Sequence, residues 1–362
     1  MTIEWLAGNR IRGTSAEKPV SSLQSPSVGG WVELGRTTLG STNVNIDVTS
    51  LADKRYLMFL VNTTGASAIT SDGIMRVGNS SIDTGSNYAH RSSFDGGSDS
   101  TGTSATGISL SRNDTNPEWT VGYFANLSTK EKLSLAWKVE QGTAGAANAP
   151  KHRIESAGKW TNTSNVIDQY RWNTGGSETW SAGSEVVVLG WDPTDTHTTN
   201  FWEELASVEL GSANANITSG TITAKKYLWV QAYFNLADSG TTSDARLTFN
   251  SDTGSNYATR NAQNGGAEQT LTSQANTRIN YSSLTTPAFL NLFIVNNSAN
   301  EKLMIGHLTS AGTAGAGGAP DRRIEYTGKW TNTSSQITNI NFNDGGLTDY
   351  PAGTILKVWG SN

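Results

Sequence analysis

The chain repeats itself along almost its whole length, and this duplication limits the folds that it can adopt. The segment GKWTNTS at 158–164 returns unchanged at 328–334, and SIDTGSNYA at 81–89 returns as SDTGSNYA at 251–258. Equivalent residues stay between 169 and 171 positions apart. So long a repeat, with so few slips, predicts one fold used twice in tandem.

The repeat divides the chain into four segments. Residues 1–29 have no counterpart in the second copy, and we predict that they form an extended N-terminal arm. Residues 30–191 and 201–362 are the two equivalent domains, and 192–200 is a polar linker that contains Pro193. Each copy is long enough to bury a core of its own.

Each copy carries the hydrophobic patterns of β-strands. The run YLMFLV at 56–61 is typical of a strand covered on both faces, whereas residues alternate at 119–123 and 133–137. Turn signals such as Asp-Gly and Gly-Gly lie between these runs, and no window has a helical period longer than two turns. We therefore expect an all-β protein of two tandem antiparallel β-sandwiches, jelly-roll-like, with about eight strands each. An immunoglobulin-like sandwich is the alternative.

Composition excludes several classes of function. The net charge is −5 and no Lys/Arg run exceeds two residues, so the clustered positive charge that tracks a nucleic-acid backbone is lacking. No apolar run is long enough to span a membrane, and the first residues do not resemble a signal peptide. We expect synthesis in a cytoplasm without conventional secretion. The chain has no cysteine, which excludes disulfides and thiolate metal sites.

Each copy contains Asp-Thr-Gly, the active-site signature of two-lobed aspartic proteases, at 83–85 and 252–254. Those enzymes hold one aspartate from each lobe so close together that the two carboxyls share a proton. Here polar residues precede each triplet, and neither a Tyr-Gly flap nor a later apolar-apolar-Gly loop follows. The sequence favours a polar loop, in which the aspartate accepts backbone hydrogen bonds and the glycine adopts a positive φ. The protease is the least favoured reading, and we predict no catalytic residue and no cofactor.

Weaker patterns suggest two binding sites. Oxygen-bearing side chains in the two loops are candidate ligands of a cation such as calcium, although neither loop is a complete calcium motif: Asp83, Asn87, Asp252 and Asn256. Trp172 and Trp180 lie in a polar stretch and are candidates for stacking on a sugar. Most of the twelve tryptophans are expected in cores or interfaces, and the repeated pair Trp160 and Trp330 in a structural role.

Three motifs follow one another in a fixed order in the second copy. They are RLTFNSDTGSNY at 246–257, WTNTSSQI at 330–337, and AGT at 352–354 shortly before VWG at 358–360. This order resembles a domain found in virion structural proteins of tailed phages. The resemblance covers 31–190 and 202–360 but not the arm, and the first copy departs from it at 76–79, where RVGN lacks the Phe-Asn pair.

The resemblance implies a non-enzymatic component of a virus particle, at the capsid surface, in the tail or in a fibre. Its implied partners are further copies of itself, with a trimer expected by analogy, other virion proteins and, for an adhesive component, host glycans. A self-assembling extracellular filament and a glycan-binding adhesin are the alternatives. In each case apolar residues of the arm could add a strand to the sheet edge of a neighbour: Ile3, Trp5, Leu6 and Ile11.

Overall fold

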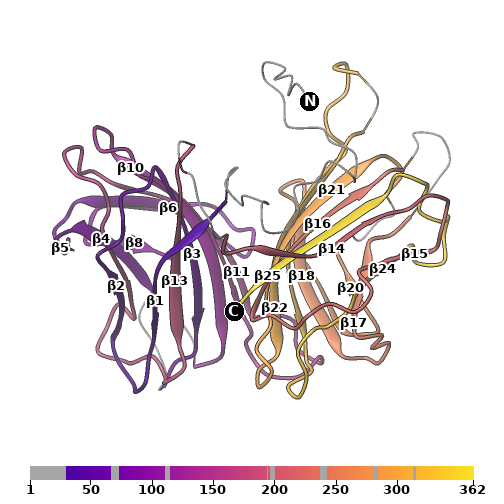
Figure 1. The fold of residues 1–362 in the computed structure, drawn as a ribbon, viewed down its shortest axis with the longest axis horizontal. Helices are drawn as coiled ribbons and strands as arrows, with labels where there is room; N and C mark the ends of the chain where they lie inside the picture. The colour runs from indigo at the N-terminus through magenta and orange to yellow at the C-terminus, as the bar shows by residue number, and fades with distance from the viewer. Residues whose placement is uncertain are drawn as a thin grey trace, which may run out of the picture.

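The computed structural model describes residues 30–66, 73–110, 115–193, 195, 200–236, 243–280, 284–312 and 315–362. These residues form strands β1 to β25, which build four antiparallel sheets, and they contain no helix. Figure 1 shows two sandwiches side by side, the first in indigo to magenta and the second in orange to yellow. The predicted arm lies outside the described residues.

The first sandwich pairs an eight-stranded sheet with a five-stranded one. The large sheet runs in the order β1 (Val32–Thr38), β13 (Glu185–Trp191), β3 (Tyr56–Thr63), β9 (Glu118–Ala125), β10 (Lys132–Glu140), β11 (His152–Trp160), β6 (Tyr88–Phe94) and β7 (Ser100–Ala105). The small sheet runs β2 (Asn45–Thr49), β12 (Gln169–Asn173), β4 (Ile74–Asn79) and β5 (Ser81–Ile82), with β8 (Ile108–Ser109) paired to β4.

The second sandwich repeats this arrangement. Its large sheet runs β14 (Glu203–Glu209), β25 (Ile355–Ser361), β16 (Tyr227–Phe234), β21 (Ala288–Val295), β22 (Lys302–Ser310), β23 (Arg322–Trp330), β18 (Tyr257–Gln263) and β19 (Gln269–Gln274). Its small sheet runs β15 (Asn216–Thr218), β24 (Ile340–Asn343), β17 (Arg246–Phe249) and β20 (Thr277–Arg278). The two orders match except for β5, which has no counterpart, because β20 corresponds to β8. The predicted fold class of two tandem antiparallel β-sandwiches is confirmed.

Strand β3 shows how the sequence pattern produces the layers. Leu57, Phe59 and Val61 face the small sheet and join the core of the first sandwich, while Met58 and Leu60 point the opposite way into a second apolar cluster. Successive side chains of a strand alternate between faces, so a continuous apolar run requires cover on both sides. The cover on the second face is the other sandwich.

The number of strands differs from the expectation of about eight per copy. The first sandwich has β1 to β13 and the second β14 to β25. The additional strands are short or polar, such as β7, whose sequence is STGTSA. Such strands pair through their backbones at a sheet edge and leave no apolar alternation in the sequence.

The core of the first sandwich contains three buried charges. Lys138 Nζ lies 3.1 Å from Glu118 Oε2 and 3.2 Å from Glu140 Oε1. Burial lowers the pKa of Lys138, but the two carboxylates outweigh this effect and raise the pKa, so the lysine is charged. In the second sandwich the equivalent places hold buried, uncharged residues: Ala288, Leu308 and Ser310.

Candidate functional site

The Asp-Thr-Gly segment of the first sandwich is a hydrogen-bonded loop. Asp83 Oδ1 accepts a hydrogen bond from the backbone N–H of Gly85 at 2.8 Å. Asp83 Oδ2 accepts two more, from Asn87 Nδ2 at 2.9 Å and from the indole Nε1 of Trp160 at 2.8 Å. The aspartate therefore ties its own loop to the end of β11, where Trp160 is buried in the core.

The second sandwich builds the same loop from the equivalent residues. Asp252 accepts hydrogen bonds from Gly254 N–H at 2.9 Å, from Asn256 Nδ2 at 3.0 Å and from Trp330 Nε1 at 2.7 Å. The structural role expected for the repeated tryptophans is confirmed, because each indole donates to its aspartate from a buried position.

The tyrosine after each loop anchors it to the small sheet. The Tyr88 hydroxyl donates to the carbonyl of Val77 at 2.6 Å and accepts from its N–H at 3.1 Å, and the Tyr257 hydroxyl accepts from Phe249 N–H at 3.0 Å. In the sheet registers Val77, opposite Tyr170, corresponds to Phe249, opposite Ile340. The first copy therefore has valine where the phage-type pattern has phenylalanine, and its tyrosine hydroxyl bonds the equivalent N–H. The adjacent Gly78 has no room for a side chain, because a Cβ there would lie 1.9 Å from the carbonyl oxygen of Ser81.

The loop glycines have another role than the one expected. Neither Gly85 nor Gly254 is among the residues with positive φ, so that expectation is wrong. A Cβ on Gly254 would instead lie 2.8 Å from Asn256 Nδ2 and 3.1 Å from Asp252 Oδ1. The aspartate and asparagine side chains close over this position, so a larger residue would displace them from their hydrogen bonds.

These contacts do not fit an aspartic-protease dyad. Partial burial raises the pKa of Asp83 and of Asp252, but the hydrogen bonds, led by those from the tryptophans, outweigh it and hold each pKa below its ordinary value. A shared-proton pair needs two carboxyls in contact, one of them with a raised pKa. Here both carboxylates are bonded within their own sandwich, so the geometry supports the polar-loop reading.

The same contacts leave few oxygen ligands for a cation in these loops. The oxygens of Asp83 and Asp252 already accept N–H bonds, and the amide nitrogens of Asn87 and Asn256, not their oxygens, face the carboxylates. A calcium site needs six to eight converging oxygens. Within the described residues, no group of three or more His, Asp or Glu side chains could hold a metal ion.

The two tryptophans considered for sugar stacking are buried. Trp172 and Trp180 have no exposed surface and belong to the core of the first sandwich. Trp172 points inward from β12, two residues after the equally buried Tyr170. The predicted glycan contact is wrong for both rings, because neither face is open to a ligand. The candidate assembly residues Ile3, Trp5, Leu6 and Ile11 lie outside the described residues.

The large sheets of the two sandwiches pack face to face through a shared apolar cluster. Trp119 of β9 stacks on Tyr227 of β16 with ring centroids 5.4 Å apart and an interplanar angle of 19°. The cluster combines side chains of both sandwiches, all nearly or fully buried: Met58, Leu60, Trp119, Val121, Val139, Val187, Leu189, Phe201, Trp202, Tyr227, Phe293, Val295, Leu303 and Ile305. The interface therefore resembles the interior of a single domain.

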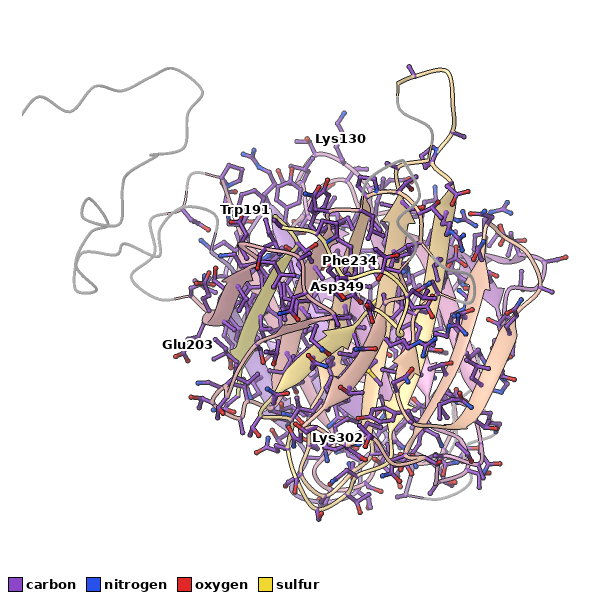
Figure 2. The ribbon with its side chains drawn as sticks, turned by 90° about the vertical axis from the view of Figure 1, so that its right-hand side faces the viewer. Lys130, Trp191, Glu203, Phe234, Lys302 and Asp349 are labelled. Carbon is purple, nitrogen blue, oxygen red and sulfur yellow. The ribbon has the colours of Figure 1, made fainter. Side chains whose placement is uncertain are left out.

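The sandwiches meet head to tail, not through equivalent surfaces. Tyr227 and Val295 lie opposite each other on neighbouring strands, and both belong to the shared cluster. Their equivalents in the first sandwich, Tyr56 and Ala125, also lie opposite each other but do not belong to it. Figure 2 accordingly shows Lys130 of the first sandwich and Lys302 of the second, which mark equivalent ends, at opposite ends of the molecule.

A buried carboxylate lies at one edge of this interface. Glu185 Oε1 accepts hydrogen bonds from the Tyr227 hydroxyl at 2.5 Å and from Lys226 Nζ at 2.9 Å, and Arg36 lies 3.3 Å away. Burial raises the pKa of Glu185, but hydrogen bonds from Thr38 and from these partners lower it below its ordinary value. Burial and the nearby carboxylate raise the pKa of Tyr227.

A second polar group closes the opposite edge. Arg153 of β11 is almost fully buried and contacts Glu268 at 2.8 Å and Glu325 at 3.0 Å, both in the second sandwich. Lys329 Nζ donates to the carbonyl of Thr143 at 2.7 Å, and Glu301 accepts from Gly145 N–H at 2.6 Å. Buried ion pairs that cross an interface fix its register, because breaking one leaves an uncompensated charge.

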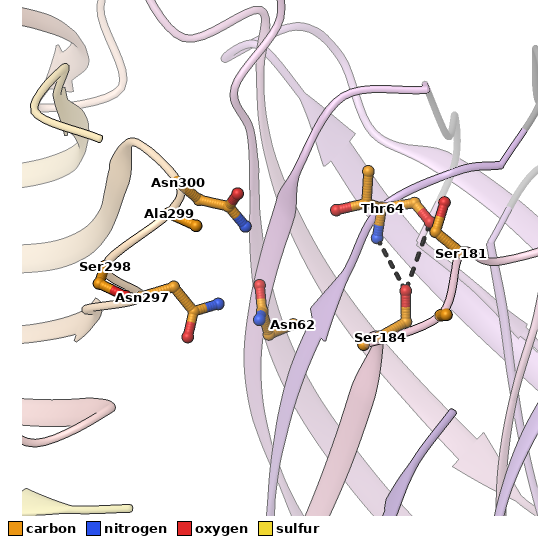
Figure 3. Close-up of a pocket in the computed structure, with 10 residues that line it drawn as sticks. Asn62, Thr64, Ser181, Ser184, Asn297, Ser298, Ala299 and Asn300 are labelled. Atoms are coloured by element: carbon orange, nitrogen blue, oxygen red, sulfur yellow. Dashed lines mark hydrogen bonds between the residues drawn. The ribbon is translucent and has the colours of Figure 1, made fainter. Parts of the chain in front are cut away.

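A polar hollow of about 430 Å³ lies where the two sandwiches meet. Figure 3 shows Asn62 on one side and Asn297 and Asn300 on the other, while Ser184 exchanges hydrogen bonds with the backbone of Thr64 at 3.1 and 3.3 Å. The lining residues carry amides and hydroxyls but no ionisable group. This hollow can therefore offer hydrogen bonds but no acid or base.

An apolar groove of about 590 Å³ lies on the large sheet of the first sandwich, beside the interface. Leu133 and Leu135 of β10 are 58% and 53% exposed, and Tyr56 is also exposed. Further aromatic residues line it, among them Trp191, which is labelled in Figure 2. We call this surface the apolar groove; it is lined by Trp31, Tyr56, Leu57, Tyr123, Phe124, Ala125, Leu133, Ser134, Leu135, Ala157, Gly158 and Trp191.

Comparison with known proteins gives little further guidance. No family model and no curated protein matches the chain. Domains LG4-5 of the mouse laminin alpha1 chain are similar at 13% identity and a TM-score of 0.21, over 92% of this chain and 90% of that one. A crystal structure of HCR/D-Sa-GBL1/C is similar at 10% identity and a TM-score of 0.17, over 88% and 93%. These scores are too low to carry an argument, so the fold rests on the sheets described above.

Proposed function

We propose that the protein is a non-enzymatic structural subunit of a virus particle, in which two β-sandwiches act as one rigid building block. The observation that carries this proposal is the interface between the large sheets, with its stacked Trp119 and Tyr227 and its buried Arg153. An interface as apolar as a domain core keeps its two sides in one arrangement. A fixed shape is what a repeating assembly requires of its subunit.

The chemistry of the loops supports a structural role. Asp83 and Asp252 are engaged in loop hydrogen bonds with lowered pKa values, which suits a carboxylate that stabilises a turn and does not suit a general acid. The hollow near Asn62 has no ionisable side chain. The motifs at 246–257 and 330–337, which resemble those of phage virion proteins, support a place on the virion. Its proposed partners are further copies of itself and other virion proteins.

The experiment is to locate the chain in virus particles. Particles from a culture that produces the protein are separated on a density gradient, and their proteins are identified by mass spectrometry. We expect the chain in fractions that contain packaged nucleic acid, at a fixed ratio to the major capsid protein. Its absence from those fractions, or filaments of the purified protein without nucleic acid, would overturn the virion assignment in favour of an extracellular fibre.

A second measurement addresses the absence of catalysis. Purified protein is incubated with an unfolded protein substrate between pH 3 and pH 5, beside an Asp83→Asn variant. We expect no cleavage by either protein. Cleavage that the variant loses would reject the structural reading of the loop.

A further inference from the structure

We propose that the apolar groove of the first sandwich is the surface at which a second copy of this chain docks, groove against groove, around a two-fold axis. This inference deepens the proposed function and rests on it only in taking the chain to assemble. It names the surface through which assembly begins.

The first step is the exposure of large apolar side chains at one place. Leu133 and Leu135 lie on the same face of β10, because side chains two residues apart share a face, and both are more than half exposed. Tyr56 stacks on Trp191 with ring centroids 5.3 Å apart, which extends this face across β3 and β13. Monomeric proteins rarely expose such contiguous apolar surface, whereas interaction sites do.

The second step is the fate of the same face in the second sandwich. The residues equivalent to Tyr56, Leu133 and Leu135 are Tyr227, Leu303 and Ile305, as the strand registers show. All three are buried against the first sandwich. In the second copy this face packs on a flat, apolar β-sheet surface. In the first copy the same face keeps Tyr56, Leu133 and Leu135 exposed, with Trp31 packed beside them against Tyr123 and Trp191.

The third step is continuity with the existing interface. Trp31 and Tyr123 line the groove, and they also pack against the apolar cluster between the two sandwiches. Their rings lie 6.0 Å apart. A second copy placed on the groove would therefore extend a buried apolar layer that already exists. The exposed pair formed by Lys159 and Glu131, 2.9 Å apart, would lie at its polar rim.

The fourth step identifies which surface of the second copy docks. The face of the first sandwich that receives Tyr227 includes Leu60, Val121 and Val139. The equivalent positions in the second sandwich are polar, namely Gln231, Asn291 and Thr309. Gln231 Nε2 donates to Asn291 Oδ1 at 3.1 Å, and the remaining hydrogen-bonding groups of these side chains face water. A head-to-tail chain of molecules would cover them with the apolar groove, which offers them no hydrogen-bond partner. The groove of a second copy is apolar and therefore matches this groove better than the polar surface does. A surface that pairs with the same surface of a second copy gives a closed two-fold dimer.

The test measures molar mass by sedimentation equilibrium across a range of concentrations of the full chain. Three variants are compared with the wild type. Leu135→Lys lies in the groove, and Leu347→Lys is a control on another leucine, 45% exposed against 53% for Leu135. Phe289→Lys changes the exposed residue of the second sandwich that is equivalent to Trp119. We expect a wild-type dimer that Leu135→Lys weakens by roughly tenfold to hundredfold, as for loss of a central contact. The other two variants should dimerise as the wild type does.

Other results would overturn the proposal. A wild type that stays monomeric up to its solubility limit, or a Leu135→Lys variant that dimerises normally, leaves the groove without this role. Open oligomers that Phe289→Lys abolishes would show head-to-tail contact instead. If the chain is found in virus particles but the Leu135→Lys variant dimerises as the wild type does, the groove is rejected as the dimer surface and the proposed function stands.

A milder substitution keeps the test informative if the lysine variant fails to fold. Because the chain has no cysteine, Leu135→Cys and Leu347→Cys each introduce a single thiol. A short bis-maleimide should join two Leu135→Cys chains and not two Leu347→Cys chains. If the thiol at 135 is instead protected within a monomer and becomes reactive when residues 1–29 are removed, the groove belongs to the N-terminal arm and the proposal fails.

Discussion

Replacing Lys138 by leucine should strongly destabilise the first sandwich, although the second sandwich has leucine at the equivalent position. In the wild type, Lys138 is fully buried between Glu118 and Glu140, with contacts of 3.1 and 3.2 Å. At an effective dielectric constant of about 20, each contact corresponds to an attraction of about 5 kcal/mol. This attraction offsets the cost of removing three charges from water.

The Lys138→Leu variant loses the attraction and keeps two buried carboxyl groups. Breaking a buried pair on one side costs about 3–5 kcal/mol, and we expect a loss of that size in the free energy of unfolding at pH 7. The carboxyls can avoid the charge by binding protons. The folded variant would then hold more protons than the unfolded chain, so its stability should increase as the pH falls, by about 1.4 kcal/mol per unit for each proton.

The second sandwich supplies the compensating change. A triple variant, Glu118→Ala with Lys138→Leu and Glu140→Ser, copies its residues Ala288, Leu308 and Ser310. Replacing a whole buried ionic group by apolar residues is often neutral or stabilising, so the triple variant should recover most of the loss at pH 7. The assay is guanidinium unfolding followed by tryptophan fluorescence at pH 5 and pH 7. A single variant that loses less than about 1 kcal/mol, or a triple variant as unstable as the single one, would refute this account.

Three further predictions concern the loops, the interface and a close contact between strands. Asp252→Asn should lower the free energy of unfolding by about 1 kcal/mol at pH 7, because a charge-assisted hydrogen bond to a partly exposed loop is lost. Since the pKa of Asp252 is lowered, its contribution is present above the ordinary aspartate pKa of about 4 and is lost as the pH falls below that value, so the melting temperatures of wild type and variant should converge in acid. Tyr227→Phe removes the 2.5 Å hydrogen bond to Glu185 and should cost about 1–2 kcal/mol; an unchanged melting temperature would contradict it. Gly122→Ala would place a Cβ 2.1 Å from Cζ of Phe59, and we expect a loss of about 1–3 kcal/mol in chemical unfolding.

Much of the fold could be predicted because the repeat and the strand periodicity are both visible in the sequence without knowledge of which residues are in contact. The run at 56–61 indicated a strand covered on both faces, and the repeat indicated that two such strands belong to equivalent folds. What covers the second face could not be predicted, because the residues that meet at an interface are far apart in sequence. Trp119 and Tyr227 look like ordinary strand aromatics until the registers bring them together.

The site was harder to predict because the same residue types serve several purposes. Asp-Thr-Gly at 83–85 suggested a positive φ, whereas Gly85 has none and lies under the side chains of Asp83 and Asn87. Polar neighbours suggested that Trp172 is exposed, yet alternation with Tyr170 in β12 places both in the core. That alternation is visible in the sequence and could have predicted that Trp172 is buried. No sequence feature indicated the apolar groove, because Leu133 and Leu135 alternate along their strand as core residues do.

The strength of the contact between the sandwiches has a consequence for the peptide that joins them. Lys54 pairs with Asp195 at 2.5 Å, and the N–H of Phe201, the first residue after the connection at 192–200, donates to the carbonyl of Trp31 at 2.7 Å. Its covalent continuity matters during folding, when it keeps the halves at high effective concentration. Once the halves have met, a nick in this segment should leave them together. Two fragments of the chain, expressed separately, should then reconstitute one folded molecule.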